Sequence, residues 1–169
     1  MKQTIQILFL ILILTATTPL YAQNDSISQR ITLRNIPVSI IPPKYFEYDS
    51  ISDRISHEGT MSSIHATIVK KRNFKQITSA MTDKYMKSQG FELLEKMETT
   101  MQNGDEAVIF RCRFRSHDAN GKELDFIRLM LFSGKENTLW ITADFPECIA
   151  PQIEEPIRES MKTTRNEGV

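Results

Sequence analysis

Arginine is the residue type that most suggests a chemistry in this sequence. Arg111, Arg113 and Arg115 fall at every second position of one strand-like run, and Arg128 lies in the next run. Side chains two residues apart on a strand share one face of a sheet, so this spacing predicts a basic face. The simpler interpretation is a solvated ladder of ion pairs, offset by acids such as Glu92, because such pairs are common and weak on exposed strands. The alternative is a site for an anion or an acidic partner.

Large apolar residues share this predicted face, and arginine mixed with aromatic side chains is enriched at protein interfaces. We therefore predict a partner-binding surface, with two aromatic residues at its rim. The candidate residues are Arg111, Arg113, Arg128, Trp140, Tyr45 and Phe46. The run around Trp140 fits two registers, so the sheet face of Trp140 stays open.

Catalytic chemistry has little support in the sequence. None of the histidines, His57, His65 and His117, is paired with another at the spacing of metal ligands. Cys112 and His117 are five residues apart on one predicted strand, so they point to opposite faces and form no thiol–imidazole pair. No nucleophile elbow, phosphate-binding loop, dinucleotide-binding fingerprint or zinc-protease motif is present. The sequence therefore predicts no catalytic residue, no metal and no cofactor.

The arginines have to be positioned by residues 91–145, which form four strand-like runs separated by turn signals. Asn103-Gly104 and Asn120-Gly121 are strong hairpin signals, because Asn and Gly tolerate the positive φ of a two-residue turn. With these turns at the two tips, Arg113 lies opposite Arg128. One apolar set then shares a single face: Val108, Phe110, Cys112, Phe114, Ile127, Leu129 and Leu131. The stretch is thus predicted to be an antiparallel meander.

A helix is expected over residues 73–89. Asn73 suits the N-cap position, and Gln76 follows three residues later, as in a capping box. Gly90 is the residue type expected just beyond a helix C-terminus. This helix should cover one face of the meander.

A second helical pattern follows the meander, at residues 149–161. It contains Pro156, which predicts either a kink near that residue or a helix that begins there. Shorter strand-like runs occupy residues 31–41 and 51–71. The predicted fold class is therefore α+β, an antiparallel sheet with a meander core, flanked by helices.

The N-terminal 22 residues have the pattern of an export signal. Lys2 supplies a positive start, Ile5–Leu14 is apolar, and Ala22 ends an acceptable cleavage site. The apolar run is shorter than the ~20 residues of a membrane span. We predict cleavage after Ala22, a flexible arm at 23–30 and a single domain at 31–165, with no transmembrane segment after cleavage. Loss of the leader changes the formal net charge from 0 to −1, which gives no indication of nucleic-acid binding.

Cys112 and Cys148 both belong to the predicted exported part. An oxidising compartment permits a disulfide, and the bond requires Cα atoms within about 7 Å. The spacing does not decide between a disulfide and two small buried apolar residues.

Two copies of a three-residue pattern, Asp25-Ser26-Ile27 and Asp49-Ser50-Ile51, occur in the chain. They resemble a short motif used for O-glycosylation in some exported bacterial proteins. Three residues by themselves define no function.

The order of the expected elements resembles the PsbP-like α/β/α sandwich superfamily, also called Mog-like. That group includes PsbP, the Ran-binding Mog proteins, DcrB-type exported bacterial proteins and type VI secretion effector chaperones. The resemblance spans roughly Val38 to Met161 and is carried by VSIIPPKYF at 38–46, GFELLEKMETTMQNGDEAVIF at 90–110 and TLWITADFP at 138–146. Two features differ from the sequences of some members, namely the prolines of the last helix and the lack of a lipid-attachment cysteine. The resemblance implies a non-enzymatic binding or accessory role and transfers no functional residue, since its members share no common active site.

We therefore predict an exported, non-catalytic binding or accessory domain, periplasmic or secreted, whose partner is an unknown envelope or secreted protein. One alternative is a carrier for an apolar small ligand, enclosed beneath Phe74, Met81 and Met97. A large apolar cavity at that position would favour the carrier. The other alternative is a hydrolase with an unrecognised site, which a deep pocket around a carboxylate or histidine of shifted pKa would favour.

Overall fold

The computed structural model describes residues 29–118 and 120–168. The predicted leader at 1–22, most of the predicted arm and the first Asp-Ser-Ile copy lie outside the described residues. Arg30, the last residue of the predicted flexible arm, is held in place: its guanidinium donates to the Ser39 hydroxyl at 3.1 Å and to the Thr163 carbonyl at 2.8 Å. No helix of the described part is both long and apolar enough to cross a membrane.

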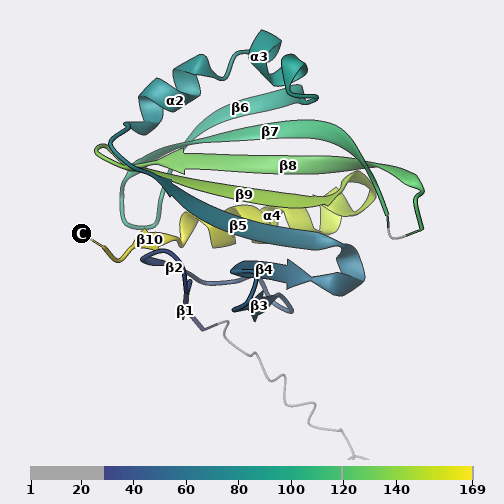
Figure 1. Ribbon diagram of the computed structural model, residues 1–169, viewed down its shortest axis with the longest axis horizontal. Coiled ribbons are helices and arrows are strands. Elements are labelled where there is room, and N and C mark those ends of the chain that lie inside the picture. Colours follow the sequence, from purple (N-terminus) through teal and green to yellow (C-terminus); the bar gives the residue numbers. More distant parts are fainter. Residues whose placement is uncertain (1–28, 119, 169) are drawn as a thin grey trace, which may run out of the picture.

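The described residues form a seven-stranded antiparallel sheet and a small three-stranded sheet (Figure 1). The strand order in the large sheet is β3-β4-β5-β9-β8-β7-β6, so the last four strands in sequence are the predicted meander. Its strands are β3 (Glu47–Asp49), β4 (Arg54–His57), β5 (Ser62–Val69), β6 (Glu92–Thr100), β7 (Glu106–His117), β8 (Glu123–Ser133) and β9 (Thr138–Pro146). The small sheet has the order β1-β2-β10, with β1 (Ile31–Thr32), β2 (Val38–Ile40) and β10 (Arg165–Asn166).

Helices lie on both faces of the large sheet (Figure 1). The helices α2 (Phe74–Ala80) and α3 (Asp83–Ser88) cover one face, and α4 (Ala150–Lys162) covers the other. A short 3-10 turn, η2 (Glu147–Ile149), leads from β9 into α4, and another, η1 (Glu58–Thr60), follows β4. The α+β prediction is therefore confirmed.

The predicted helix over 73–89 is two helices. The capping box at its start is present, with Lys75 N donating to the Asn73 side chain at 2.8 Å. The interruption lies at Thr82, whose hydroxyl accepts from Tyr85 N at 3.2 Å and caps a new helix. Threonine offers the backbone this local hydrogen bond, so it begins a helix more readily than it continues one. In α4 the prediction of a start at Pro156 is wrong, because the helix begins at Ala150 and includes that proline.

The two predicted hairpin turns are each one residue longer than expected. Met101 N donates to Asp105 O at 2.8 Å, and Asp118 N donates to Lys122 O at 2.9 Å, so each loop contains three residues. The glycine at the end of each loop has positive φ, +89° at Gly104. A type I turn followed by such a residue is the usual three-residue hairpin. The extra residue moves all β7–β8 pairs and the β6–β7 pairs nearest the turn by one position, which flips the partner strand's side chains to the other face. A β-bulge between Leu93 and Glu95 moves the remaining β6–β7 pairs by a second position.

The register correction gives each sheet face its own core. Phe110 lies opposite Met130, not Leu131, and Arg113 lies opposite Ile127, not Arg128. The core on the α2/α3 side consists of Phe74, Met86, Val108, Phe110, Cys112, Met130 and Phe132. The larger core on the α4 side includes Ile109, Ile127, Leu129, Leu131, Ile141, Phe145, Ile157 and Met161.

Candidate binding site

The six predicted surface residues do not form one surface. Arg111 and Arg113 lie on the α4 side of the sheet, whereas Arg128 pairs with Cys112 across β7 and β8 and lies on the α2/α3 side. Trp140, whose face the sequence left open, lies opposite Phe132 on the α2/α3 side. The expectation of one arginine face was wrong because it depended on two-residue turns.

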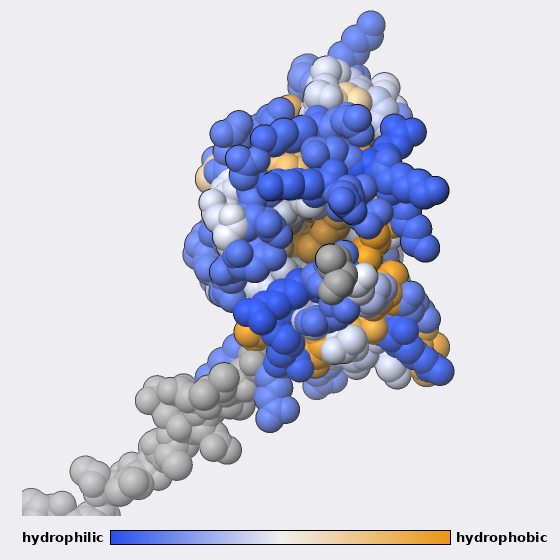
Figure 2. Space-filling view, turned by 90° about the vertical axis from the view of Figure 1, so that its left-hand side faces the viewer, coloured by the Kyte–Doolittle hydropathy of each residue, from blue (hydrophilic) through white to orange (hydrophobic). Residues whose placement is uncertain are grey.

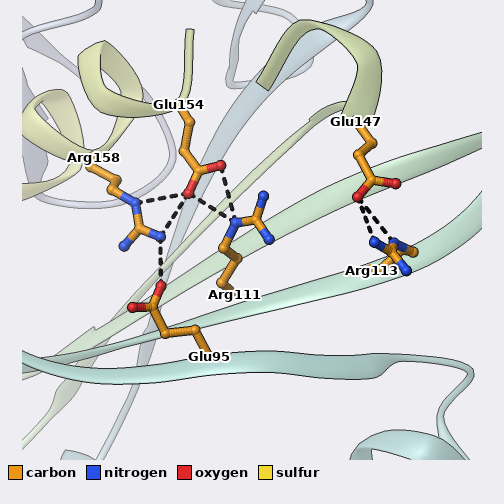
Figure 3. A network of polar contacts seen from close by, with 6 residues as sticks. All are labelled: Glu95, Arg111, Arg113, Glu147, Glu154 and Arg158. Atoms are coloured by element: carbon orange, nitrogen blue, oxygen red, sulfur yellow. Dashed lines mark hydrogen bonds and ion pairs between the residues drawn. The ribbon is translucent and has the colours of Figure 1, made fainter. Parts of the chain in front are cut away.

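Arg111 takes part in an ion-pair network that fixes α4 to the sheet (Figure 3). Its Nε lies 3.0 and 3.1 Å from the two carboxylate oxygens of Glu154, which projects from α4. The same carboxylate accepts from Arg158 Nη2 at 2.7 Å, and Arg158 reaches Glu95 on β6 at 3.2 Å. The Arg158 side chain is only 8% exposed, so this is a nearly buried charge with two acidic partners. Arg111 is therefore engaged within the protein rather than presented to a partner.

Arg113 is engaged in the same way near the start of α4 (Figure 3). Its guanidinium donates to Glu147 at 2.7 Å and to Glu92 at 3.2 Å. Glu147 belongs to η2, so this pair fixes the turn that leads into α4. Part of the expected solvated ladder is present, because Arg113 pairs with Glu92 on β6 and Arg115 lies 3.4 Å from Asp125 on β8. The contacts of Arg111 with Glu154 and of Arg113 with Glu147 join the sheet to α4 and η2 instead.

Arg128 is enclosed by an acid and two aromatic rings. It makes a two-pronged contact with Asp144 on β9, with both N–O distances 2.6 Å. Its guanidinium lies 5.0 Å from the ring centre of Phe91 and 4.9 Å from that of Phe114. Hydrogen bonding to Asp144 raises the pKa of Arg128 against the opposing effect of burial. This arginine, like Arg111, is partly buried and makes its contacts within the fold.

The two cysteines are free thiols in different surroundings. Cys112 is fully buried opposite Arg128, and burial raises the pKa of its thiol to about 11 against the opposing charge of Arg128. Cys148 is exposed in η2.

We expect one thiol per chain to react in the native protein and two after unfolding, because thiolate formation and access both control reactivity. Cys148 should be the residue that reacts in the native protein. The protein would first be reduced, the reductant removed, the thiols alkylated and the modified residue identified by mass spectrometry. A separate sample that is never treated with reductant provides the contrary outcome. If this sample shows no reactive thiol after unfolding, the protein contains a disulfide.

The predicted rim residues differ in exposure. Tyr45 is 73% exposed, adopts a left-handed backbone conformation with φ of 69°, and has the Lys44 ammonium 5.1 Å from its ring centre. Phe46 is half-buried, with its ring centre 5.7 Å from that of His57. Trp140 packs on Phe132 at 5.2 Å between ring centres. Of the six predicted residues, Tyr45 is thus the most open to solvent.

The sequence missed a hollow at one end of the molecule, where the two sheets meet. Three segments border it: the β6–β7 loop, the β8–β9 loop and the C-terminal segment that includes β10. The hollow has a volume of about 470 Å³ and is lined by Met101, Asn103, Asp105, Ser133, Gly134, Lys135, Glu136, Asn137, Leu139, Thr164, Arg165, Asn166 and Glu167. We call it the end hollow. Figure 2 looks onto this end of the molecule and shows hydrophobic surface near its centre, surrounded by hydrophilic side chains.

A second hollow of about 410 Å³ adjoins the end hollow, because Asn137 and Asn166 line both. Ile36, Pro37 and Ile68 contribute apolar surface to it. Together the two hollows form a longer recess across this end. No single stretch of sequence could indicate the recess, since its walls come from segments more than 100 residues apart.

The end hollow combines an apolar floor with a rim that contains both cations and acids. Met101 and Leu139 are nearly buried, at 4% and 8% exposure, and form apolar parts of the lining. The hydroxyl oxygen of Thr164, also in the lining, is buried and has no hydrogen-bond partner among the described residues. The charged members of the lining are two cations and three acids, namely Lys135, Arg165, Asp105, Glu136 and Glu167. Such a recess suits a ligand of little net charge that has both apolar and hydrogen-bonding groups.

The large apolar cavity expected beneath Phe74, Met81 and Met97 for an apolar-ligand carrier does not match what lies there, which is a charged groove beside Phe74. Phe74 and Met81 belong to the α2/α3-side core, but Met97 packs on the opposite face of the sheet. A groove of about 490 Å³ does run beside Phe74, and Lys75, Lys96, Glu98 and Glu106 are among its lining residues. Lys75 and Glu106 pair across it at 2.7 Å, so this groove is charged rather than dry and apolar.

Within residues 29–118 and 120–168, no group of three or more His, Cys, Asp or Glu side chains is placed to hold a metal ion. The sequence matches no protein-family model and no curated protein.

The fold itself is similar to solved structures. LpqN of Mycobacterium tuberculosis, described as involved in cell envelope biogenesis, matches with a TM-score of 0.53 and 12% identity over 80% of this chain and 88% of LpqN. PsbP (CyanoP) of Synechocystis sp. PCC 6803 matches with a TM-score of 0.53 and 9% identity over 82% of this chain and 91% of CyanoP. The chain therefore has the PsbP-like fold, as its order of elements predicted.

Proposed function

We propose that this protein is an exported, non-catalytic accessory domain that binds an extended segment of an envelope or secreted protein in the end hollow. The observation that carries the proposal is the recess at the junction of the two sheets, with its apolar floor and its rim of mixed charge. The predicted leader supports export. The similarity in fold to LpqN, a protein of cell envelope biogenesis, is compatible with a role outside the cytoplasm.

The division of the recess into two adjoining hollows, rather than its volume, favours a peptide over a compact ligand. Small-molecule sites are typically enclosed cavities of roughly 300–1,000 Å³. Here the volume is divided between two adjoining hollows of about 470 and 410 Å³ that share Asn137 and Asn166. A peptide segment can place one apolar side chain in each hollow while its backbone amides meet the polar rim. The acids of the rim outnumber its cations, three to two, which supports neither nucleic acid nor a strongly acidic ligand.

The test is partner capture followed by measured affinity. Mature protein, residues 23–169, would be used to capture partners from the envelope fraction of its host, and the purified partner would then be titrated. The double variant Lys135→Glu/Arg165→Glu reverses two exposed rim cations and is expected to weaken binding about tenfold, about 1.4 kcal/mol. The matched control, Lys84→Glu/Lys122→Glu, changes net charge equally at exposed positions outside the hollow and should bind like wild type.

Equal affinity of both double variants would exclude the end hollow as the binding site. A small molecule that co-purifies in the hollow, seen by native mass spectrometry and displaced by the rim variant, would contradict the peptide proposal and favour a carrier.

A further inference from the structure

The second Asp-Ser-Ile copy lies at the tip of the β3–β4 hairpin. Asp49 pairs with Arg54 as the last pair of the ladder, so the connecting loop is Ser50 to Asp53. Ser50 and Ile51 are both exposed, and the Ile51 side chain is 89% exposed, the highest value among the large exposed apolar residues of the described chain. Turn tips are usually occupied by Gly, Pro, Asn, Asp or Ser, each of which helps the chain to turn. Isoleucine does not help it to turn, and at this exposure it contributes no packing.

Hydrogen bonding distinguishes the two serines of the loop. The Asp49 carboxylate accepts from Ile51 N at 2.8 Å, from Ser52 N at 3.3 Å and from the Ser52 hydroxyl at 2.7 Å. An exposed aspartate is ionised at neutral pH, and these bonds, the Ser52 hydroxyl first, lower the pKa of Asp49 further. The Ser50 hydroxyl has no hydrogen bond to the described residues. Ser50 thus presents a free hydroxyl between an ionised acid and an exposed apolar side chain.

The loop is anchored at its far end. Asp53 is only 6% exposed and accepts from the Tyr48 hydroxyl at 2.6 Å, from Arg34 N at 2.9 Å and from Asn35 N at 3.0 Å. Burial by itself would raise the pKa of Asp53, but these hydrogen bonds outweigh it and the pKa is lowered. The carboxylate therefore ties the hairpin to the β1–β2 loop, and the exposed tip is held on an ordered base.

We propose that Ser50 is an acceptor for an O-linked glycan, with Asp49 and Ile51 as the side chains that a glycosyltransferase recognises. In the transfer, the Ser50 oxygen bonds to the anomeric carbon of a sugar donor whose leaving group is a phosphate or diphosphate. The bond from that carbon to the phosphate oxygen breaks, the phosphate leaves with the electron pair, and the serine proton passes to a base of the transferase. The inference is independent of the proposed function, since none of residues 49–53 lines the end hollow.

The test is peptide mapping of the protein isolated from its own host. Trypsin cleaves after Lys44 and Arg54, so the peptide 45–54 carries Ser50 and Ser52 apart from the Ser26 copy, which falls in a different peptide. Wild-type peptide 45–54 is expected to carry a saccharide mass on Ser50, localised by electron-transfer fragmentation. Ser50→Ala should remove this mass completely. Ser52→Ala removes the neighbouring serine and one hydrogen bond to Asp49, and it should retain the mass because Ile51 N still donates to that carboxylate. Ile51→Ser should reduce occupancy at least severalfold.

The proposal fails if wild-type peptide 45–54 is unmodified in the exported protein, if the mass persists in Ser50→Ala, or if it is that of a phosphate. Thermal unfolding of each variant provides the folding control, and the exposed position of Ser50 predicts an unchanged melting temperature for Ser50→Ala.

Discussion

Replacing Glu154 by alanine is expected to lower the free energy of unfolding by about 3 kcal/mol. The Glu154 side chain is 17% exposed and bridges Arg111 on β7 to Arg158 on its own helix. Its removal leaves Arg158, 8% exposed, with only the half-exposed Glu95 as a partner. Removing one partner of a buried ion pair lowers the free energy of unfolding strongly because the remaining charge stays desolvated. Urea denaturation should show a lower midpoint with an unchanged slope.

The neighbouring Glu155 offers a matched control, because it is exposed on the same helix. Glu155→Ala should change the free energy of unfolding by less than about 0.5 kcal/mol. High salt screens exposed charges far more than buried ones, so the difference between the two variants should persist at 1 M salt. If Glu154→Ala is as stable as Glu155→Ala, the network does not hold α4 against the sheet.

The second large effect is expected at Gly134, in the β8–β9 loop at the rim of the end hollow. Its φ is +106°, a conformation that residues with a side chain rarely adopt, and an added Cβ would overlap the backbone carbonyl oxygen of Asn137. Since backbone cannot move aside as a flexible side chain can, Gly134→Ala should cost about 3 kcal/mol. The loop must also rearrange, so binding in the end hollow should weaken in the same variant.

The variant Gly90→Ala separates the cost of positive φ from the cost of the overlap with Asn137. Gly90 also has positive φ, +80°, but an added Cβ there would meet nothing within 4 Å. It should therefore cost only about 1 kcal/mol, from backbone conformation alone, and should leave partner binding unchanged. Similar losses of stability in the two variants would show that the overlap with Asn137 is relieved by a small shift of the loop.

The sequence by itself determined the local elements of this protein. Alternation of apolar residues between turn signals located β6 to β9, and the Asn73–Gln76 capping box located the start of α2. These signals involve residues close together in the chain, where hydrogen bonding and side-chain direction depend on nearest neighbours. The order of the elements was enough to predict the PsbP-like fold.

The register of the sheet was decided only in the tertiary structure. An Asn-Gly pair fits a two-residue turn, but it also fits the last two positions of a three-residue loop, as at Gly104. An apolar pattern normally discriminates between such registers, because one face is buried and the other solvated. Here α2 and α3 cover one face and α4 the other, so β8 has apolar residues on both faces and either register buries them. The predicted turn was one residue shorter than the real loop, and this difference placed Arg128 on the wrong side of the sheet.

The partners of the charged residues and the end hollow also depended on tertiary structure. Arg111 pairs with Glu154, 43 residues further along the chain, and nothing local to Arg111 indicates that helix. The end hollow joins the loops near Met101 and Gly134 to the C-terminal segment at Thr164. Contacts of this kind arise when separate elements pack together to bury apolar surface, and the packing determines which polar groups meet. The sequence therefore identified residues capable of binding, and the fold determined which of them remain free to bind.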